Sequence, residues 1–520
     1  MTDQQPITLP NNSQVATELT YDLLVIGGGI NGVGVARDAA GRGLHVLLVE
    51  QGDLAQSTSS ASSKLIHGGL RYLEYYEFRL VRESLLEREI LLKNAPHIIW
   101  PMRFIMPHNK LLRPAWMIRL GLFLYDHLAP RRKLPGSNGV RLRKHQYGYP
   151  LKSNLVRGFV YSDCWVQDSR LVALNAKDAQ DRGAVVKTRT KCTEAIVDRQ
   201  EWLATLLDKQ TGQQRQVRAK MLINTAGPWV DQFLTQALQI QPKHRLRLVK
   251  GSHIIVPKLY EGSQAYILQN NDRRVIFVIP YEEKFTLIGT TDLPVDESTL
   301  DNMRISPEEA DYLCQAVNQY FKTQITAQDV VSSYAGVRPL YDDAKANASA
   351  VTRDYVLQLH TDLGAPLLSV YGGKITTYRR LAEHVMQKIH PFFPNLGKSW
   401  TAKTPLPGGN ITTSFTEFCH QLSLIYPWLP KELCYRYARA YGDNITVLLK
   451  STHSIAELGL EILPGLYEQE IAYLKKYEFA KTAEDILWRR SKLGLHLQSN
   501  AVEKLQKFLD QQNSVSKSAI

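Results

Sequence analysis

The chain has 520 residues, of which 44% are hydrophobic, so it is too long for one small core and too apolar for a disordered protein. The 63 lysines and arginines outnumber the 50 aspartates and glutamates, and the formal net charge of +13 indicates an anionic partner: nucleic acid, an acidic membrane surface or a phosphorylated substrate. The five cysteines form no C-x-x-C pair, which excludes a disulfide framework or a zinc knuckle and favours a reducing compartment.

The first 20 residues are polar and predict a loose tail rather than a signal peptide, because no apolar run there is flanked by basic residues. We therefore do not expect export. No stretch of the chain approaches the roughly 20 apolar residues that a membrane-spanning helix needs. The sequence thus predicts a protein that is soluble or lies on a membrane surface.

Residues 21–50, YDLLVIGGGINGVGVARDAAGRGLHVLLVE, predict one strand–helix–strand unit with a glycine-rich turn before the helix. Gly27, Gly29 and Gly32 have the G-x-G-x-x-G spacing, which permits a tight turn, close approach of a pyrophosphate and close packing of the helix. Glu50 ends the second strand, where a carboxylate accepts hydrogen bonds from a ribose and disfavours a ribose 2′-phosphate. The pattern predicts a dinucleotide site for NAD or FAD.

Residues 59–74, SSASSKLIHGGLRYLE, combine small hydroxyl residues, a glycine pair and the polar side chains of Lys64, His67 and Arg71. Small residues let another molecule approach the backbone, and the polar side chains can bind it. The alternative for this stretch alone is a helix N-cap with a solvated arginine and a core histidine.

The later segments alternate between strand and helix patterns. Helical periodicity begins at about Tyr76 and ends before Pro96. Residues 219–230 predict a buried strand that enters a glycine turn, and residues 274–292 predict a β-hairpin. Residues 366–389 predict another strand, a Gly-Gly turn and a helix.

These patterns predict an α/β fold with mixed sheets and a helical end. We expect a tail over residues 1–20, a cofactor domain interleaved with a substrate domain over 21–400, and a helical domain over 401–520. The substrate part is expected at roughly 95–150 and 240–335. Residues 401–413, rich in proline and glycine, would be the linker.

Residues 113–133, RPAWMIRLGLFLYDHLAPRRK, join apolar side chains to clusters of arginine and lysine. The segment is too short to span a bilayer and suits a helix that lies on anionic lipid. An ordinary buried helix with solvated basic ends fits the periodicity equally well.

The longest motifs jointly resemble the FAD-dependent glycerol-3-phosphate dehydrogenases of the D-amino-acid-oxidase-like flavoprotein group. The resemblance rests on residues 22–44 and on STSSASSKLIHGGLRYLE, NTAGPW, KGSHIIVP, AGVRPL, TRDY and YGGKITTYR. It implies a Rossmann-like FAD-binding domain interleaved with a mixed-sheet substrate domain. It also implies oxidation of sn-glycerol 3-phosphate to dihydroxyacetone phosphate, with electrons passed from the flavin to a membrane quinone.

The Gly27–Gly32 turn and Glu50 predict tightly but noncovalently bound FAD. We expect a cytoplasmic enzyme that is peripheral on the inner face of the cell membrane. A homodimer is among the assemblies to expect, and neither a metal site nor a nucleic-acid partner is expected. One rival is a glycerol-3-phosphate oxidase that reduces oxygen. A rival of another class is a flavin-containing nucleic-acid-binding protein, against which the absence of an aromatic-rich basic RNA motif counts.

By resemblance, the residues of the site fall into three groups. Those expected at the cofactor are Gly27, Gly29, Gly32, Glu50, Ser62, Ser63, Lys64, His67, Gly227, Gly373, Thr376 and Thr377. Those expected at the substrate are Arg71, Tyr72, Arg338, Arg353 and Lys374. The catalytic candidates are His253, His67 and Arg338.

Each group has a chemical reason. Several cations hold a phosphomonoester best, because arginine supplies a planar fork and lysine a point charge. Removing a hydroxyl proton as hydride leaves carbon requires a base of pKa near neutrality, for which His253 is preferred over His67, while an arginine could act electrostatically instead. Thr376 and Thr377 open a helix whose N-terminal dipole would stabilise negative charge on reduced flavin.

Overall fold

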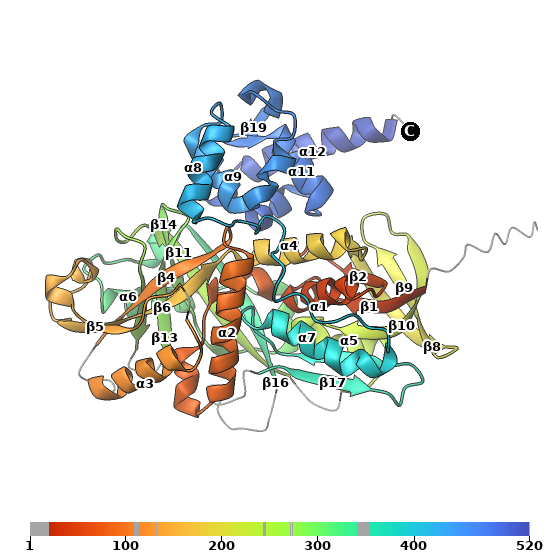
Figure 1. Cartoon of the computed structure of the whole chain (residues 1–520), viewed down its shortest axis with the longest axis horizontal. Helices are drawn as coiled ribbons and strands as arrows, with labels where there is room; N and C mark the ends of the chain where they lie inside the picture. The colour runs from red at the N-terminus through yellow and green to blue at the C-terminus, as the bar shows by residue number, and fades with distance from the viewer. Residues whose placement is uncertain are drawn as a thin grey trace, which may run out of the picture.

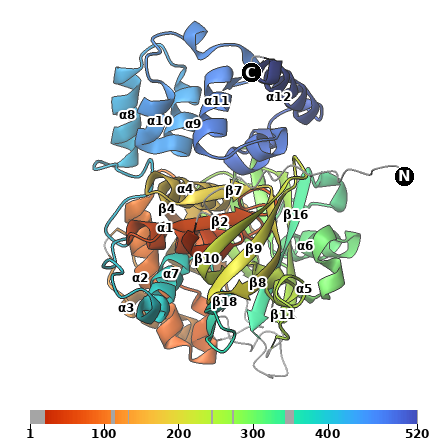
Figure 2. The same cartoon turned by 90° about the vertical axis from the view of Figure 1, so that its right-hand side faces the viewer.

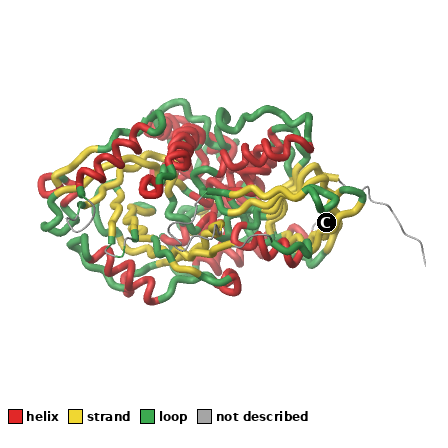
Figure 3. Tube along the Cα trace, turned by 90° about the horizontal axis from the view of Figure 1, so that it is seen from below, coloured by secondary structure: helices red, strands yellow, loops and turns green. Residues whose placement is uncertain are grey.

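The computed structural model describes residues 20–108, 114–131, 133–242, 246–270, 272, 274–341 and 354–518. Within these ranges two β-sheets and their helices form a body, and a helical C-terminal domain lies over one side of it (Figure 1). The view turned by 90° separates this blue domain from the body beneath it (Figure 2). From below, strands gather toward both ends of the long axis with helices between them (Figure 3).

The first sheet has eight strands in the described residues and a parallel centre. The strands are β1 Thr20–Ile26, β2 Val46–Glu50, β7 Val185–Thr188, β8 Thr190–Asp198, β9 Glu201–Asp208, β10 Gln214–Asn224, β17 Val356–His360 and β18 Leu367–Tyr371. Their order is β17–β18–β10–β1–β2–β7, in which β18 to β7 run parallel and β17 is antiparallel. β9 pairs antiparallel with both β10 and β8.

Both faces of this sheet are covered, as its continuous apolar strands require. Helices α1 Ile30–Gly41, α4 Asp168–Asp181 and α7 Tyr378–Ile389 pack together on one face. Side chains of β1 alternate between the layers: Leu23 and Val25 pack with these helices, whereas Leu24 and Ile26 pack with β8, β9 and helix α5 Val230–Ala237. The carboxyl end of β1 is thereby fixed at the glycine turn.

The second sheet has ten strands in the described residues and is mostly antiparallel. The strands are β3 Leu65–Ile66, β4 Ile99–Pro107, β5 Asn138–Arg141, β6 Arg157–Val166, β11 Leu246–Pro257, β12 Ala265–Gln269, β13 Val275–Tyr281, β14 Phe285–Gly289, β15 Leu293–Pro294 and β16 Ser332–Tyr341. Helix α6 Pro307–Asn318, which begins at a capping box of Ser306 and Glu309, packs on one face. Helices α2 Phe78–Asn94 and α3 Ala115–His127 pack against a second hydrophobic core, which this sheet also helps to form.

The C-terminal domain has its own core. Its elements are α8 Phe415–Ile425, α9 Lys431–Tyr441, α10 Ile445–Leu448, the hairpin β19 Glu461–Leu463 and β20 Leu466–Tyr467, α11 Glu468–Tyr477, a π-helical turn Asp485–Arg490 and α12 Ala501–Ser518. Tyr437, Ile471 and Leu487 are fully buried in this core. No helix in the described ranges is both long and apolar enough to cross a membrane.

The expected α/β class, the strand–helix–strand unit, the helix that ends before Pro96 and the 274–292 hairpin are confirmed. The expected tail, Arg113, Arg132 and Arg353 lie outside the described residues. The second sheet reaches beyond the ranges expected for the substrate part, because it also includes β3 and β6 and because β16 extends to Tyr341. We retain limits near residues 20 and 400 as our proposal for the domains.

Candidate functional site

The glycine turn between β1 and α1 has no room for a side chain at Gly27 or Gly32. Gly27 has φ +108°, a left-handed conformation that glycine adopts at low cost. A Cβ on Gly32 would lie 1.9 Å from the carbonyl oxygen of Gly27. Gly29 is the N-cap of α1 and offers no side-chain cap, so the helix N-terminus can serve an anion.

Glu50 lies beside this turn at the end of β2. Its carboxylate accepts hydrogen bonds from the backbone N–H of Gly28 at 2.6 Å and of Gly52 at 2.7 Å. Burial raises the pKa of Glu50, and the two N–H groups oppose that shift. A cavity of about 300 Å³ is lined by Gly27, Gly29, Glu50, Gly227 and Trp229 among others.

A second cavity, of about 380 Å³, adjoins the first and will be called the cleft. The two cavities share Gly29, Thr58, Ser59 and Gly227 as lining residues. The cleft brings together most of the residues expected from the sequence, although they come from distant segments. These are Gly29, Ser62, Ser63, His67, Arg71, Tyr72, Gly227, His253, Arg338, Gly373, Lys374 and Thr376.

Five expected cofactor residues are absent from the lining of the cleft as the described residues form it: Gly27 and Glu50, which line the first cavity, and Gly32, Lys64 and Thr377, which line neither cavity. The ammonium of Lys64 is 2.9 Å from both carboxylate oxygens of Asp168 and 3.0 Å from the Ser60 carbonyl oxygen. Asp168 also accepts from the Ser62 hydroxyl at 2.7 Å. Lys64 therefore holds the loop from inside, because a buried ammonium needs this carboxylate as its partner.

The glycine pair after His67 is fixed by another buried carboxylate. Asp163 accepts from the Tyr125 hydroxyl at 2.8 Å and from Arg88 at 2.7 Å, and the Tyr125 oxygen accepts from the Gly68 N–H at 2.8 Å. A Cβ on Gly68 would lie 2.6 Å from that oxygen. The sequence analysis did not identify Asp163, Asp168 or Tyr125 as residues that support the site. A signal was present for the two aspartates, because they lie on or just after the apolar strand 157–166, where a buried carboxylate needs a specific partner.

His253 forms part of the cleft wall and is 3% exposed. Its Nε2 lies 2.8 Å from the Ser63 hydroxyl, and its ring stacks on Tyr334 with centroids 4.8 Å apart. Burial lowers the pKa of His253 to about 3, and the charges of Lys64 and Arg338 add to this shift. The pKa of His253 thus lies below the near-neutral value expected for a base, because the sequence reveals neither the desolvation nor the two neighbouring cations.

Four cations also line the cleft. Arg338, on β16, donates to the Thr291 carbonyl oxygen at 3.0 Å and lies 3.1 Å from Asp292. The ammonium of Lys374 lies 3.8 Å from the ring centroid of Tyr72. Arg71 and Arg274 also line the cleft. Arg274 was not predicted, since it follows the turn after β12 and carries no motif of its own.

The family comparisons match almost the whole described body. Residues 22–379 match the family model of FAD dependent oxidoreductases, and residues 399–515 match the C-terminal domain of alpha-glycerophosphate oxidase. The chain belongs to the FAD-dependent oxidoreductase family. Its cofactor is FAD, and the expected fold class and flavoenzyme chemistry are confirmed.

Similar proteins extend over nearly the full length. The chain is 55% identical to a glycerol-3-phosphate dehydrogenase of Pseudomonas aeruginosa over 95% of this chain and 96% of that protein. It is 48% identical to the aerobic glycerol-3-phosphate dehydrogenase of Escherichia coli, covering 94% and 97%. It is also 52% identical to a D-erythritol 1-phosphate dehydrogenase of Brucella abortus, covering 92% and 95%. The resemblance expected from the sequence is thus confirmed.

A solved structure supports the same assignment. The glycerol-3-phosphate dehydrogenase of Bacillus halodurans complexed with FAD has a TM-score of 0.74 and 28% identity, and the match covers 95% of this chain and 94% of that one. The residues present here fit a flavin dinucleotide. The Gly27–Gly32 turn leaves room for a pyrophosphate, Glu50 lies at the adjoining 300 Å³ cavity, and the cleft continues from Gly29 toward His253.

Proposed function

We propose that this flavoenzyme oxidises sn-glycerol 3-phosphate to dihydroxyacetone phosphate and passes the electrons to a membrane quinone. One observation carries the proposal: the cleft that continues from the cofactor turn is lined by His253 together with the four cations Arg71, Arg274, Arg338 and Lys374. When bound, the flavin supplies the hydride acceptor. The chain supplies the groups that bind the phosphate and move the proton.

The cations give the site its preference for a phosphomonoester. Lys374 follows the Gly372–Gly373 turn, whose φ values of +75° and +97° project the chain back into the cleft. Arg338 extends from β16. Two residues earlier on the same strand, Gly336 packs closely on Ala61, and a Cβ on Gly336 would lie 2.8 Å from Ala61 Cβ. Arg338 on a strand and Lys374 in the loop after β18 can together hold a phosphate dianion from two separate segments. We assign Arg71 and Tyr72 to the same subsite.

His253 is proposed as the group that accepts the hydroxyl proton. At neutral pH its imidazole is uncharged, as a proton acceptor must be, and burial with two nearby cations keeps it so. A bound phosphate dianion offsets those cations, which raises the histidine pKa and improves it as a base. Nε2 of the ring lies within hydrogen-bond distance of the Ser63 hydroxyl, and Nδ1 is buried without a hydrogen-bond partner among the described residues.

Helix α3 is proposed to rest on the acidic inner face of the cell membrane. Its buried residues are Leu122 and Tyr125, while Trp116, Leu120 and Phe123 are more than half exposed. Tyr75 and Tyr76 of the neighbouring turn are exposed as well, and Tyr75 lines the cleft. An apolar surface beside the mouth of the cleft suits a lipid-soluble acceptor better than the buried-helix alternative does.

The decisive test is anaerobic. Glycerol 3-phosphate added to the purified holoenzyme should bleach the flavin absorbance, whereas glycerol at the same concentration should not. D-erythritol 1-phosphate, the substrate named for the Brucella relative, serves as the competing phosphate ester. Faster bleaching by that compound would replace glycerol 3-phosphate as the proposed substrate.

The acceptor is tested on the reduced enzyme. Quinone and oxygen are offered separately, and the rate at which flavin absorbance returns is followed. Rapid reoxidation by quinone and slow reoxidation by oxygen support the dehydrogenase. Rapid reoxidation by oxygen, with peroxide formed, would establish the oxidase instead.

A further inference from the structure

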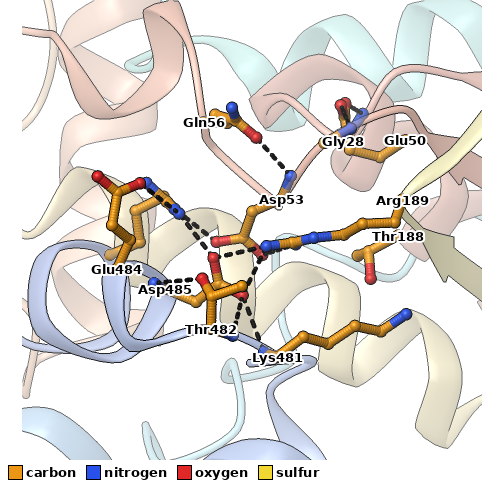
Figure 4. Close-up of polar contacts among 12 residues, drawn as sticks. Gly28, Glu50, Asp53, Gln56, Thr188, Arg189, Lys481, Thr482, Glu484 and Asp485 are labelled. Atoms are coloured by element: carbon orange, nitrogen blue, oxygen red, sulfur yellow. Dashed lines mark hydrogen bonds and ion pairs between the residues drawn. The ribbon is translucent and has the colours of Figure 1, made fainter. Parts of the chain in front are cut away.

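A buried cluster of charges joins the C-terminal domain to the loop that follows β2. Asp53 is fully buried and accepts from Arg490 at 2.6 and 2.7 Å and from Arg489 at 2.5 Å. Arg189 lies 3.1 Å from Asp53 and donates to Asp485 at 2.7 and 2.8 Å. Figure 4 shows Asp53, Arg189 and Asp485 facing one another.

The residues that the C-terminal domain contributes to this cluster are held in place by further hydrogen bonds. Asp485 accepts from the backbone N–H of Lys481 at 2.8 Å and of Thr482 at 3.0 Å, and from Arg489 at 2.6 Å. These donors and arginines lower the pKa of Asp485, so the carboxylate stays charged. Asp53 is therefore held by side chains whose own positions are fixed.

The loop that Asp53 anchors also carries Glu50. Glu50 binds the backbone N–H of Gly52, and Asp53 binds the side chain of Gln56 through its own N–H at 2.7 Å (Figure 4). Glu50, Gln51, Gln56 and Ser57 all line the 300 Å³ cavity next to the glycine turn. Only Gly52 separates Gln51, which lines the cavity, from Asp53, the carboxylate that three arginines contact.

We propose that Asp53 is a positioning residue through which the docked C-terminal domain sets the affinity for FAD. With the arginines in place, the loop is held where Glu50 meets the cofactor and bridges to Gly28. Without Arg489 and Arg490, which the C-terminal domain supplies, Asp53 keeps only Arg189 of the body as a charged partner, at 3.1 Å, and the loop loses its closest contacts. The inference rests on the proposed role of Glu50 at the adenosine end of the cofactor.

The coupling is reciprocal by thermodynamic linkage. If docking of the C-terminal domain tightens FAD binding, FAD must tighten docking by the same factor. Added FAD should therefore slow proteolysis in the 401–413 segment that leads into the C-terminal domain. This second readout does not depend on catalysis.

The experiment compares Asp53→Asn with Glu478→Gln in the full-length holoenzyme. Glu478 forms the other buried ion pair between the domains, with Arg170 of α4, whose second nitrogen lies 2.9 Å from it. In the described residues the Glu478 carboxylate binds Arg170 and does not contact the Glu50–Gln56 loop. Arg490 Nε donates to the Glu478 backbone carbonyl oxygen at 2.7 Å, a contact that Glu478→Gln leaves in place. FAD release is followed after dilution by the rise in flavin fluorescence, and cleavage near 401–413 is measured with and without added FAD.

Asp53→Asn should release FAD about tenfold faster or more, while Glu478→Gln stays near the wild-type rate. Added FAD should slow cleavage strongly in the wild type and weakly in Asp53→Asn. Equal release from both variants would mean that domain docking in general retains the cofactor, and wild-type release from Asp53→Asn would refute the proposal directly.

Two further variants keep the outcome interpretable. Arg490→Lys retains the charge but loses the two-pronged contact, so it should shift FAD release in the same direction even if Asp53→Asn does not fold; an unchanged rate would again refute the coupling. Glu50→Gln tests the adenosine role separately. If Glu50→Gln retains FAD normally, the role proposed for Glu50 fails, whatever Asp53→Asn shows.

Discussion

At the scale of single residues, the phosphate cations make the clearest prediction. Arg338→Ala and Lys374→Ala should each lower kcat/KM for glycerol 3-phosphate while barely affecting the slow use of glycerol, which lacks the phosphate. Losing one charged hydrogen-bond partner costs about 1.5–3 kcal/mol, or roughly tenfold to a hundredfold in kcat/KM. The control is Lys220→Ala, because Lys220 is exposed and pairs with Asp22 outside the cleft. Wild-type kinetics in both variants would move the phosphate subsite elsewhere.

His253 makes a prediction about pH. Its pKa of about 3 means that the ligand-free imidazole takes up a proton only as pH falls toward 3, rather than near 6.5. At low substrate concentration, where the pH dependence reports the enzyme before substrate binds, the rate of flavin reduction should therefore show no loss between pH 8 and 5 that depends on His253. His253→Asn should slow reduction by about 10²–10⁴-fold at all these values, as loss of a general base does.

Stopped-flow absorbance under anaerobic conditions measures both effects. The FAD content of the variant, determined from its visible spectrum, separates a slow reaction from a lost cofactor. An acid limb near pH 6.5 that disappears in His253→Asn would contradict the depressed pKa. Unchanged reduction rates would transfer the role to His67 or to the field of Arg338.

At the scale of elements, α3 is the proposed contact with lipid. Replacing Trp116 and Phe123 by serine should release the enzyme from anionic vesicles at high salt, because screening weakens the basic contribution of about 1 kcal/mol per residue. The matched control replaces Leu424 and Ile425 of α8 by serine, since these side chains are 68% and 61% exposed on the other domain. Sedimentation with vesicles measures binding. If both pairs sediment like the wild type, α3 is not the contact.

At the scale of the whole molecule, His97 lies where the body meets the C-terminal domain. Burial lowers the pKa of His97 to about 3, and Arg170 and Arg439 contribute to the shift. Neither ring nitrogen has a hydrogen-bond partner within the described part of the chain, and Gly408 approaches so closely that a Cβ there would lie 2.8 Å from Nε2. Folding therefore holds the ring neutral, whereas the unfolded chain protonates it at about pH 6.5.

The sign follows from that difference. Below pH 6.5 the unfolded state binds the extra proton, so the histidine removes about 1.4 kcal/mol of stability per pH unit until about pH 3. The free energy of unfolding of His97→Asn should thus fall less steeply with acid than that of the wild type. Urea denaturation at pH 7, 6 and 5 measures the two slopes. Parallel slopes would show that His97 is not neutral in the fold.

The sequence by itself determined the local chemistry. Glycine spacing at 27–32, with an apolar strand on either side of the helix, leaves one sterically allowed turn, and that turn appears as predicted. The same holds for the 274–292 hairpin and the helix that ends before Pro96. These features depend on neighbours within about 30 residues, so the pattern along the chain contains the information.

Only the tertiary structure decided which residues meet. Lys64 is buried on Asp168, 104 residues away, and Asp53 is gripped by Arg490, 437 residues away, and no local pattern specifies either pair. The depressed pKa of His253 likewise comes from packing against Tyr334, Lys64 and Arg338, which lie on other segments. Desolvation and ion pairing depend on three-dimensional distance, and the sequence alone sets that distance only through the complete fold.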